Sequence, residues 1–397
     1  MLYQLEGSQA VAKAVALSRP KVICAYPITP QTHIVEGVGD LVRSGELSDC
    51  EFINVESEMA ALSVAIGSQA AGVRSYTATS SQGLLYMMEA VYNAAGLELP
   101  IVMTLGNRTI GSPINIWNDH SDAMSARDAG WIMLFAETNQ EAFDLHIQAF
   151  KIAEKVRCPV MVCVDGFILT HAYEQVDIPS QEEVDEFLPP YKAEHMELNP
   201  DNPMAIGTMV SPEYFMEVRN LAHRRQIDSL ETIRCVGESF LKKFGRDSGG
   251  LLRKYCVEGA KTVIVTLGSA AGTIKDATDE LNSEGGKFGV VSLISYRPFP
   301  ADAICDALKN AKRVIVVEKA LAVGIGGILS QEIELALKNH NIEVISVVAG
   351  LGGRNITKTL LKECFKKENH EKTTFLGLKE DIITREYKKI TCGGCHG

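Results

Sequence analysis

The residues Pro159-Val160-Met161-Val162-Cys163-Val164-Asp165 form an unbroken apolar run between a proline and an acid. Side chains of a β-strand alternate between its two faces, so a run without polar residues predicts a strand that is covered on both faces. Pro100–Leu105 is a second run of this kind. Two such strands indicate a sheet that is buried between two layers.

Shorter strand patterns and helical periodicity alternate on the N-terminal side of these runs. We expect strands at 22–26, 51–55, 73–78, 100–105 and 160–164, and helices at 31–44, 57–72, 82–95 and 142–155. Strands of this type separated by helices are typical of a parallel sheet with helices on both faces. The N-terminal part is therefore predicted to be an α/β domain.

A second alternation of strands and helices starts at Lys261 and continues to about residue 376. Between the two series the composition changes, with an acidic segment, a Pro-Pro breaker and then a charged helical pattern. We therefore expect a first domain at 1–180, a helical connector at 181–258, a second α/β domain at 259–376 and a C-terminal tail at 377–397.

Composition and charge exclude several classes of protein. The chain of 397 residues has a formal net charge of −11 and no Lys/Arg-rich run, which argues against a nucleic-acid partner. It contains no run of 18 apolar residues that could span a membrane. The N-terminus lacks the pattern of a secretory signal, so we expect a cytoplasmic protein.

Eight of the ten cysteines are scattered without metal-ligand spacing, which suits buried apolar side chains in a reducing compartment. Cys392-Gly393-Gly394-Cys395-His396 differs, because it matches the C-x-x-C-H pattern of c-type haem attachment. Haem attachment needs export and a surrounding haem fold, and the sequence indicates neither. Two alternatives remain for Cys392 and Cys395. One is a metal or redox role shared with a partner chain, and the other is a disordered tail.

Polar residues follow the predicted strands of the first domain. They form the segments Tyr26–Pro30, Glu56–Glu58, Thr77–Gly83 and Asn107–Arg108. Ligands of open α/β sheets bind outside the carboxyl ends of strands, so these segments predict one shared site. The glycine-rich turn at 268–272 lacks the G-x-G-x-x-G spacing, and we expect it to serve packing, as do those at 324–327 and 350–353.

These segments, in this order, resemble the alpha subunits of 2-oxoacid:ferredoxin oxidoreductases, and most closely that of pyruvate:ferredoxin oxidoreductase. The resemblance covers residues 1–375. It rests on YPITP (26–30), ESEMAA (56–61), TATSSQGL (77–84), NR (107–108), PINIWNDHSDAMSARDAGW (113–131), PVMVCVDGFILTH (159–171), SYRPFP (295–300) and VVEK (316–319).

The resemblance implies a thiamine-diphosphate-binding-type pyrimidine domain followed by a transketolase C-terminal-like domain. It implies thiamine diphosphate shared with a beta subunit that holds Mg²⁺ and a [4Fe–4S] cluster. Gamma and delta subunits, ferredoxin as electron acceptor and coenzyme A as co-substrate complete the expected partners. The chain itself is expected to hold no metal, in agreement with its scattered cysteines.

The resemblance also implies roles for individual residues. Glu58 would hydrogen-bond N1′ of the aminopyrimidine and so promote loss of the thiazolium C2 proton. Arg108 and Thr29 would contact the substrate, since a guanidinium fits a carboxylate with two parallel hydrogen bonds. Glu56 is expected to be a cap or a surface acid. Further expected contacts are Tyr26, Pro27 and Ile28 beside the cofactor, and Ser81, Gln82, Asn115, Asp119 and His120 around the pocket.

The activity that the resemblance implies is the reversible oxidative decarboxylation of pyruvate with coenzyme A to acetyl-CoA and CO2. One alternative is the same chemistry on oxalate, 2-oxoglutarate or a branched-chain or aryl 2-oxoacid. The other is a non-catalytic, cofactor-binding scaffold. The intact Thr29 and the pair Asn107–Arg108 favour a small 2-oxoacid without a second carboxylate.

Overall fold

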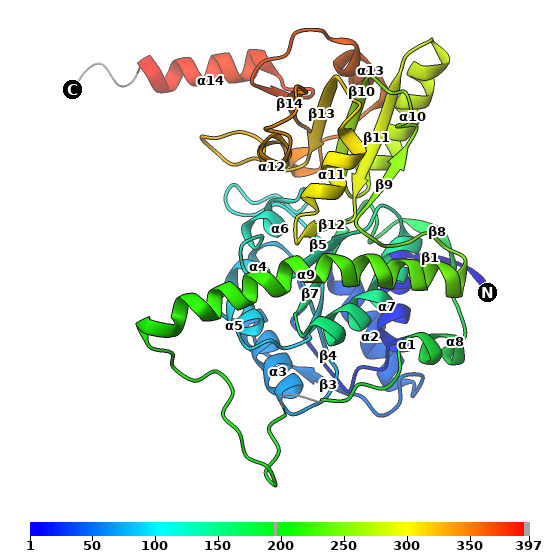
Figure 1. Cartoon of the computed structure of the whole chain (residues 1–397), viewed down its shortest axis with the longest axis vertical. Coiled ribbons are helices and arrows are strands. Elements are labelled where there is room, and N and C mark those ends of the chain that lie inside the picture. Colours follow the sequence, from blue (N-terminus) through cyan, green and yellow to red (C-terminus); the bar gives the residue numbers. More distant parts are fainter. Residues whose placement is uncertain (194–196, 393–397) are drawn as a thin grey trace.

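The computed structural model describes residues 1–193 and 197–392. Figure 1 shows two α/β bodies, one above the other, with a long helix along the N-terminal body. Cys395 lies outside the described residues, and so does the side chain of Cys392. Within the described chain, no helix is long and apolar enough to cross a membrane.

The N-terminal body is built on a seven-stranded sheet in the order β12-β6-β7-β5-β4-β2-β3. Its strands are β2 (Val22–Ala25), β3 (Glu51–Asn54), β4 (Ser75–Thr79), β5 (Val102–Asn107), β6 (Ile132–Phe135), β7 (Val160–Asp165) and β12 (Ser295–Arg297). Every neighbouring pair is parallel except β12 with β6.

Strand β7 explains why this sheet needs two covering layers. Val160, Val162 and Val164 face a core with the helices α1 (Gly7–Leu17), α2 (Thr32–Arg43) and α7 (Asn139–Val156). Met161 and Cys163 face the opposite core. That core contains α3 (Glu58–Ala70), α4 (Ser81–Tyr86) and α5 (Met88–Gly96) and continues into the C-terminal body. The predicted parallel sheet with helices on both faces is confirmed.

The C-terminal body contains a six-stranded sheet in the order β15-β14-β13-β10-β11-β9. Its strands are β9 (Leu252–Tyr255), β10 (Thr262–Leu267), β11 (Phe288–Leu293), β13 (Arg313–Glu318), β14 (Glu343–Val348) and β15 (Thr373–Phe375). Only β9 runs antiparallel within it. Its helices are α10 (Ala270–Ser283), α11 (Ala301–Leu308), α12 (Leu329–Ala336), the short 3₁₀ turn η1 (Leu351–Gly353) and α13 (Lys358–Lys366).

One strand from the C-terminal part of the chain joins the sheet of the N-terminal body, and a strand of the connecting region joins the second sheet. β12 lies inside the range expected for the second domain, yet it pairs with β6, and Phe135 N donates to Ile294 O at 2.8 Å. β9 lies inside the range expected for the connector, yet it closes the edge of the second sheet beside β11. The domains are therefore tied together by their sheets as well as by the chain.

The connecting region contains α8 (Gln181–Phe187) and the 33-residue helix α9 (Pro212–Phe244). The C-terminal half of α9 buries Ile233, Val236 and Phe240 against the N-terminal body. Gly237 lets α9 pack closely against the backbone at Gly249–Gly250, because a Cβ at position 237 would lie 2.6 Å from Gly250 N. The N-terminal half of α9 is exposed and extends past the body in Figure 1.

Four remaining elements complete the described chain. β1 (Leu2–Glu6) and β8 (Tyr173–Asp177) form a separate antiparallel pair that extends along the end of α7. The helix α6 (Ser121–Ser125) follows the polar loop after β5, and α14 (Glu380–Cys392) extends from the C-terminal body.

A candidate active site at the carboxyl edge of the first sheet

The strand order brings the predicted polar segments to one edge in a continuous row. Along this edge the strands lie in the spatial order β3, β2, β4, β5 and β7. At their carboxyl ends lie, in the same order, Glu56–Glu58, Tyr26–Pro30, Ser80–Gln82, Asn107–Arg108 and Asp165. The chain leaves β2 toward β3 on one side, and β4 returns on the other side of β2. The β2/β4 boundary is therefore the topological switch point where open α/β sheets bind ligands.

Glu58 lies at the start of α3, where the Ser57 side chain accepts a hydrogen bond from Ala60 N at 3.2 Å. The Glu58 side chain is 8% exposed, and within the described residues its carboxylate makes no hydrogen bond. Glycine at position 83 is required beside it, because a Cβ there would lie 2.8 Å from Glu58 Oε1. Glu56, by contrast, is exposed, as expected for a surface acid.

Buried hydroxyl groups lie at the end of β4, close to Glu58. Thr79 Oγ1 and Ser80 Oγ are fully buried and have no hydrogen-bond partner in the part of the chain that the structure describes. Thr79 Oγ1 would lie 2.5 Å from a Cβ on Gly83, the same glycine that borders Glu58. Buried polar atoms without a partner are uncommon in folded proteins. They therefore mark this end of β4 as a place for a polar ligand.

The Tyr26–Pro30 turn is held in position by Gln31. Gln31 Nε2 donates to Ala78 O at 2.6 Å, and Gln31 Oε1 accepts from Ile28 N at 3.2 Å. Tyr26, Pro27 and Thr29 are exposed, and Ile28 is half-buried. The turn thus presents its side chains at the edge while its backbone is fixed to β4.

Arg108 lies next to this turn. Its guanidinium donates to Thr29 O at 2.8 Å and to Asn115 O at 3.4 Å. The side chain is 9% exposed, and among the described residues it makes no ion pair. Burial lowers the pKa of Arg108, and the nearby Asp122 carboxylate opposes that shift. A buried guanidinium bonded only to backbone carbonyls retains donors for an incoming carboxylate.

Asp122 connects these segments, although sequence reasoning did not select it. Its carboxylate accepts from Ser81 N at 3.0 Å, Asn107 Nδ2 at 2.9 Å, Arg108 N at 2.9 Å and Ala123 N at 2.8 Å. Burial raises its pKa to about 6, and these hydrogen bonds oppose the shift. In the sequence, Asp122 stands out in one respect: it is a second acid after Asp119, two residues after His120, in a segment that continues into a helix.

Ser81 and Gln82 are part of this support. Ser81 has a φ of 50°, in the left-handed region, at the turn between β4 and α4. Its hydroxyl donates to Thr109 O and contacts Gln82 Oε1, while its backbone N–H donates to Asp122. Ser81 is therefore fully bonded and orients the turn, whereas the neighbouring Ser80 hydroxyl is unbonded.

His120 lies in a different part of the edge, at the contact with the C-terminal body. His120 Nε2 is 2.7 Å from Asp165 Oδ1, and Lys319 Nζ is 2.9 Å from Asp165 Oδ2. Ser269 N and Asn118 Nδ2 also donate to this carboxylate, at 3.0 and 3.2 Å. Burial alone would raise the pKa of Asp165, but Lys319 and His120 together hold it well below its usual value.

Asn115 and Asp119 also bond to the C-terminal body. Asn115 Nδ2 donates to Gly352 O at 3.2 Å, and Gly352 N donates to Asp119 Oδ2 at 3.3 Å. Gly353 is required beside this loop, because a Cβ there would lie 2.5 Å from Trp117 Cβ. The structure thus brings Thr29, Arg108 and Asn115 together, whereas the side chains of Asp119 and His120 serve the contact between the bodies.

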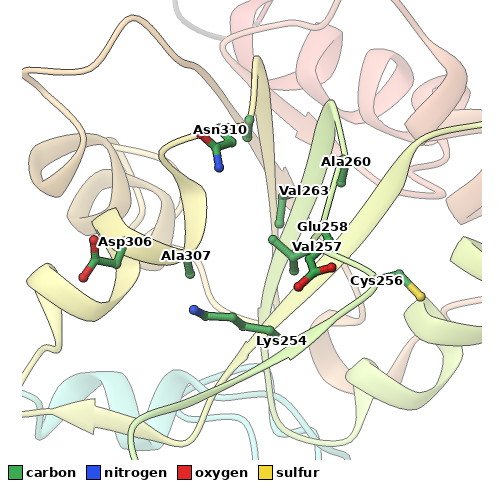
Figure 2. Close-up of a pocket in the computed structure, with 11 residues that line it drawn as sticks. Lys254, Cys256, Val257, Glu258, Ala260, Val263, Asp306, Ala307 and Asn310 are labelled. Carbon is green, nitrogen blue, oxygen red and sulfur yellow. The ribbon is translucent and has the colours of Figure 1, made fainter.

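A cavity of about 510 Å³ lies elsewhere, at the amino ends of the strands in the second sheet. Figure 2 shows Lys254, Glu258, Asp306 and Asn310 around it, from β9, the turn that follows and the end of α11. None of the residues predicted for the site lines this cavity. The row of strand ends, rather than this cavity, therefore carries the candidate chemistry.

Comparison with known families gives two matches that together span most of the chain. Residues 13–234 match the thiamine-diphosphate-binding domain of pyruvate flavodoxin/ferredoxin oxidoreductases. Residues 260–361 match core domain II of pyruvate:ferredoxin oxidoreductase.

Full-length relatives carry related names. The chain is 42% identical to pyruvate synthase subunit PorA of Methanosarcina barkeri over 96% of this chain and 97% of that one. It is 44% identical to the subunit of the same name from Methanothermobacter thermautotrophicus over 96% and 99%. It is also 39% identical to the ketoisovalerate oxidoreductase subunit VorA of Pyrococcus abyssi over 90% and 91%.

Two solved structures share the fold. A 2-oxoglutarate:ferredoxin oxidoreductase from Magnetococcus marinus superposes with a TM-score of 0.68 at 22% identity, covering 92% of this chain and 65% of that one. A split-gene transketolase superposes with a TM-score of 0.52 at 14% identity, covering 91% and 93%. These likenesses establish the two-domain α/β architecture.

Proposed function

From the premise that this chain belongs to the pyruvate flavodoxin/ferredoxin oxidoreductase family, we propose that it is the alpha subunit of a pyruvate:ferredoxin oxidoreductase. The reaction is the reversible oxidative decarboxylation of pyruvate with coenzyme A to acetyl-CoA and CO2, with electrons passing to ferredoxin. One observation supports this proposal above the others. The same edge of the sheet holds the buried Glu58 carboxylate, which has no hydrogen bond, and the Arg108 guanidinium, which has no ion pair, among the described residues.

The residues around Glu58 fit the aminopyrimidine of thiamine diphosphate. Glu58 supplies a carboxylate without a partner among the described residues. Thr79 supplies a hydroxyl, unbonded within the same residues, that borders Gly83 as Glu58 does, and Ser80 supplies a second one that borders Gly106. Glu58 would accept a hydrogen bond at N1′ of the ring, and the Tyr26–Ile28 backbone would border it. When bound, thiamine diphosphate supplies the carbon nucleophile and the electron sink for decarboxylation.

Arg108 and Thr29 would position the substrate. The guanidinium would bind the carboxylate of the 2-oxoacid, because its position within 2.8 Å of Thr29 O aims it at the exposed face of the turn. The Thr29 hydroxyl would donate to a substrate oxygen. Asp122 acts through the backbone of Arg108 and Ser81, since it touches both strand ends and is itself fully buried.

The rest of the site would come from partner subunits. Among the described residues, the one group with metal-ligating geometry, Glu6, His33 and His171, does not lie in the row of strand ends, and the eight described cysteines are free. A beta subunit would therefore supply Mg²⁺, the diphosphate site and a [4Fe–4S] cluster. Exposed Tyr26, Ile114 and Trp117 offer apolar surface for such a partner beside the site. Gamma and delta subunits and ferredoxin would complete the electron path.

A second candidate changes only the substrate. Relatives called ketoisovalerate oxidoreductase subunits are 39% identical to this chain, and their name indicates a branched-chain 2-oxoacid. The relatives named pyruvate synthase are closer, at 42 to 44%, and this difference favours pyruvate.

The test is a substrate panel. The chain is co-expressed with its partner subunits, and the purified complex is assayed with pyruvate, 2-oxoglutarate, ketoisovalerate and oxalate, each with coenzyme A and ferredoxin or viologen. We expect the highest kcat/KM with pyruvate. A higher value with ketoisovalerate would move the assignment to the branched-chain class. No turnover with any 2-oxoacid, in a complex that binds thiamine diphosphate, would instead indicate a non-catalytic scaffold.

A further inference from the structure

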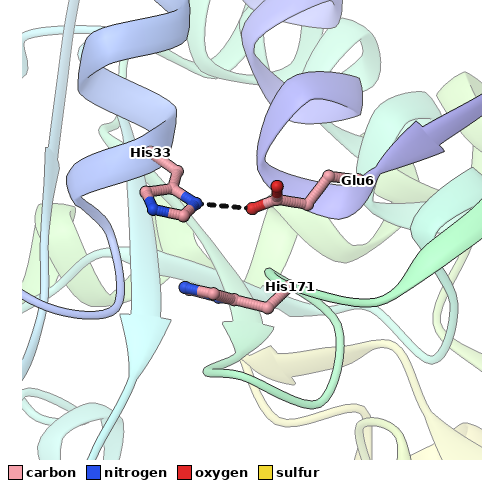
Figure 3. Close-up of side chains that lie close together, drawn as sticks. All are labelled: Glu6, His33 and His171. Carbon is pink, nitrogen blue, oxygen red and sulfur yellow. Dashed lines mark hydrogen bonds and ion pairs between the residues drawn. The ribbon is translucent and has the colours of Figure 1, made fainter.

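Three potential metal ligands from separate segments meet on the N-terminal body (Figure 3). Glu6 ends β1, His33 lies in the first turn of α2, and His171 lies in the loop after β7. Their ligand atoms all lie within 4.8 Å of one another. We propose that Glu6, His33 and His171 bind a divalent transition-metal ion such as Zn²⁺ or Co²⁺.

The geometry is close to that of a metal-bound triad. His33 Nδ1 is 2.7 Å from Glu6 Oε1, and the rings of His33 and His171 have their centroids 4.6 Å apart. Ligand atoms about 2.0–2.1 Å from a tetrahedral zinc ion are separated by about 3.3 Å. Small side-chain rotations therefore suffice to bring all three atoms to one ion. Two histidines with one carboxylate leave a further coordination position for water.

The charges also favour a cation. Within the described residues, no lysine or arginine forms an ion pair with Glu6, so its carboxylate is available to a metal ion. Two imidazole rings whose centroids lie 4.6 Å apart repel each other when both carry a positive charge, whereas both can ligate one ion as neutral rings.

His171 already has the outer support that metal-binding histidines have. Its Nδ1 lies 2.7 Å from Thr170 Oγ1, and the same hydroxyl accepts from Phe167 N at 2.8 Å. When Nδ1–H donates to this hydroxyl, the proton is held on Nδ1 and the unprotonated Nε2 is left as the metal ligand. The ring also packs against Phe167, with a centroid distance of 4.7 Å.

A bound ion would connect segments that frame the candidate active site. His33 is two residues after Gln31, which holds the Tyr26–Pro30 turn. The loop that carries His171 begins at Gly166, where a Cβ would lie 2.5 Å from Pro30 Cγ. Phe167 in this loop packs against Trp117 at 4.7 Å. The ion would therefore stiffen the wall of the site from outside, without touching the substrate.

The test uses the full-length chain with Cys392→Ser and Cys395→Ser, so that the C-terminal C-x-x-C-H segment cannot supply thiolate ligands. Metal-free protein is titrated with Co²⁺ and Zn²⁺, and binding is followed by visible absorption, calorimetry and thermal unfolding. We expect about one ion per chain with a Kd below about 10 µM. The Co²⁺ spectrum should lack thiolate bands, and Zn²⁺ should raise Tm.

Three variants locate the site. His33→Asn, Glu6→Gln and His171→Asn should each weaken Co²⁺ binding by roughly tenfold or more and remove the Zn²⁺-dependent rise in Tm. His340→Asn, at an exposed histidine outside the cluster, should change neither. Should His171→Asn fail to fold, His33→Asn decides, since the His33 side chain is 46% exposed. No saturable binding by the chain with Cys392→Ser and Cys395→Ser, or binding that His33→Asn and Glu6→Gln leave unchanged, would overturn the proposal.

Discussion

The carboxyl edge of the first sheet has two halves that differ in how their polar groups are bonded. In the half at β2, β3, β4 and β5, the Glu58 carboxylate and the Ser80 hydroxyl have no partner among the described residues. Within the same residues, the guanidinium of Arg108 bonds only to backbone carbonyls. In the half at β7, the Asp165 carboxylate is bonded to Lys319, His120 and three further donors.

This difference separates function from stability. The half at β7 is closed by the C-terminal body, so its charges are paired and hold two domains together. Among the residues that the structure describes, nothing covers the other half in this way, and its buried groups without partners cost stability unless a ligand or a partner subunit bonds to them. We therefore propose that the same kind of residue after a strand serves assembly at one end of the edge and chemistry at the other.

The largest effect on stability is expected at Asp165. Asp165→Asn should lower the free energy of unfolding by about 3–5 kcal/mol, because Lys319, which is only 3% exposed, would be left as an unpaired buried charge. Denaturant titration measures the loss. Asp185→Asn, which breaks a pair with the exposed Arg19, should cost less than about 1 kcal/mol. A loss in Asp165→Asn no larger than that in Asp185→Asn would mean that the bonded half of the edge contributes no more to stability than an exposed ion pair does.

Arg108 should show the opposite pattern. In the assembled complex, Arg108→Ala should lower kcat/KM with pyruvate by a factor between about 30 and several thousand. This corresponds to a loss of about 2–5 kcal/mol of transition-state stabilisation. Its effect on the free energy of unfolding should stay within about 1.5 kcal/mol, because its guanidinium bonds only to backbone carbonyls. Arg127→Ala, outside the row of strand ends, serves as the control. A loss of stability that matches the loss of activity would make Arg108 structural.

Asp122 should give the stability a pH dependence. Its folded-state pKa of about 6 lies above its ordinary value of 3.8, so the folded state binds the proton more readily than the unfolded state does. Its ionisation should therefore lower the free energy of unfolding as the pH rises from about 4 to about 6, by up to about 3 kcal/mol. Denaturation of wild type and Asp122→Asn at pH 4.5 and pH 7 isolates this contribution. Identical pH slopes in the two proteins would contradict it.

A substitution at Gly83 should have a smaller effect on activity. Gly83→Ala would place a methyl group 2.8 Å from Glu58 Oε1 and move the carboxylate. We expect kcat to fall roughly 10- to 100-fold, because small displacements of a catalytic group cost that much. Gly67→Ala, on the same helix as Glu58 and with nothing within 4 Å of the added Cβ, should leave kcat unchanged. A similar kcat for both alanine variants would mean that the position of Glu58 is not critical.

The layered fold could be predicted because its signal is local. The alternation of Val160, Met161, Val162 and Cys163 between two cores follows directly from an apolar run without polar interruption. The pairing of β12 with the first sheet could not be predicted, because three residues carry no periodicity and their partner β6 is far away in the sequence. The helix expected at 82–95 is divided at Met87, where the backbone leaves helical geometry between α4 and α5.

The residues of the site were predictable only in part for a related reason. Glu58, Thr29 and Arg108 follow strands directly, so their place at one edge followed from sheet geometry and from motif resemblance. Asp122 reaches the same edge through a loop and acts by accepting four N–H groups from three segments. Such convergence depends on tertiary structure, and one acid among several in a polar loop does not reveal it.

The central claim is that this chain supplies, through Glu58, the carboxylate that activates thiamine diphosphate in a site shared with a partner subunit. The most direct measurement is the rate of hydrogen–deuterium exchange at thiazolium C2 in the assembled complex, for wild type, Glu58→Gln and Glu56→Gln. We predict that Glu58→Gln slows exchange by roughly 100-fold or more while cofactor binding is retained, and that Glu56→Gln, at an exposed acid two residues away, has no effect. Exchange at the wild-type rate in Glu58→Gln would contradict the claim.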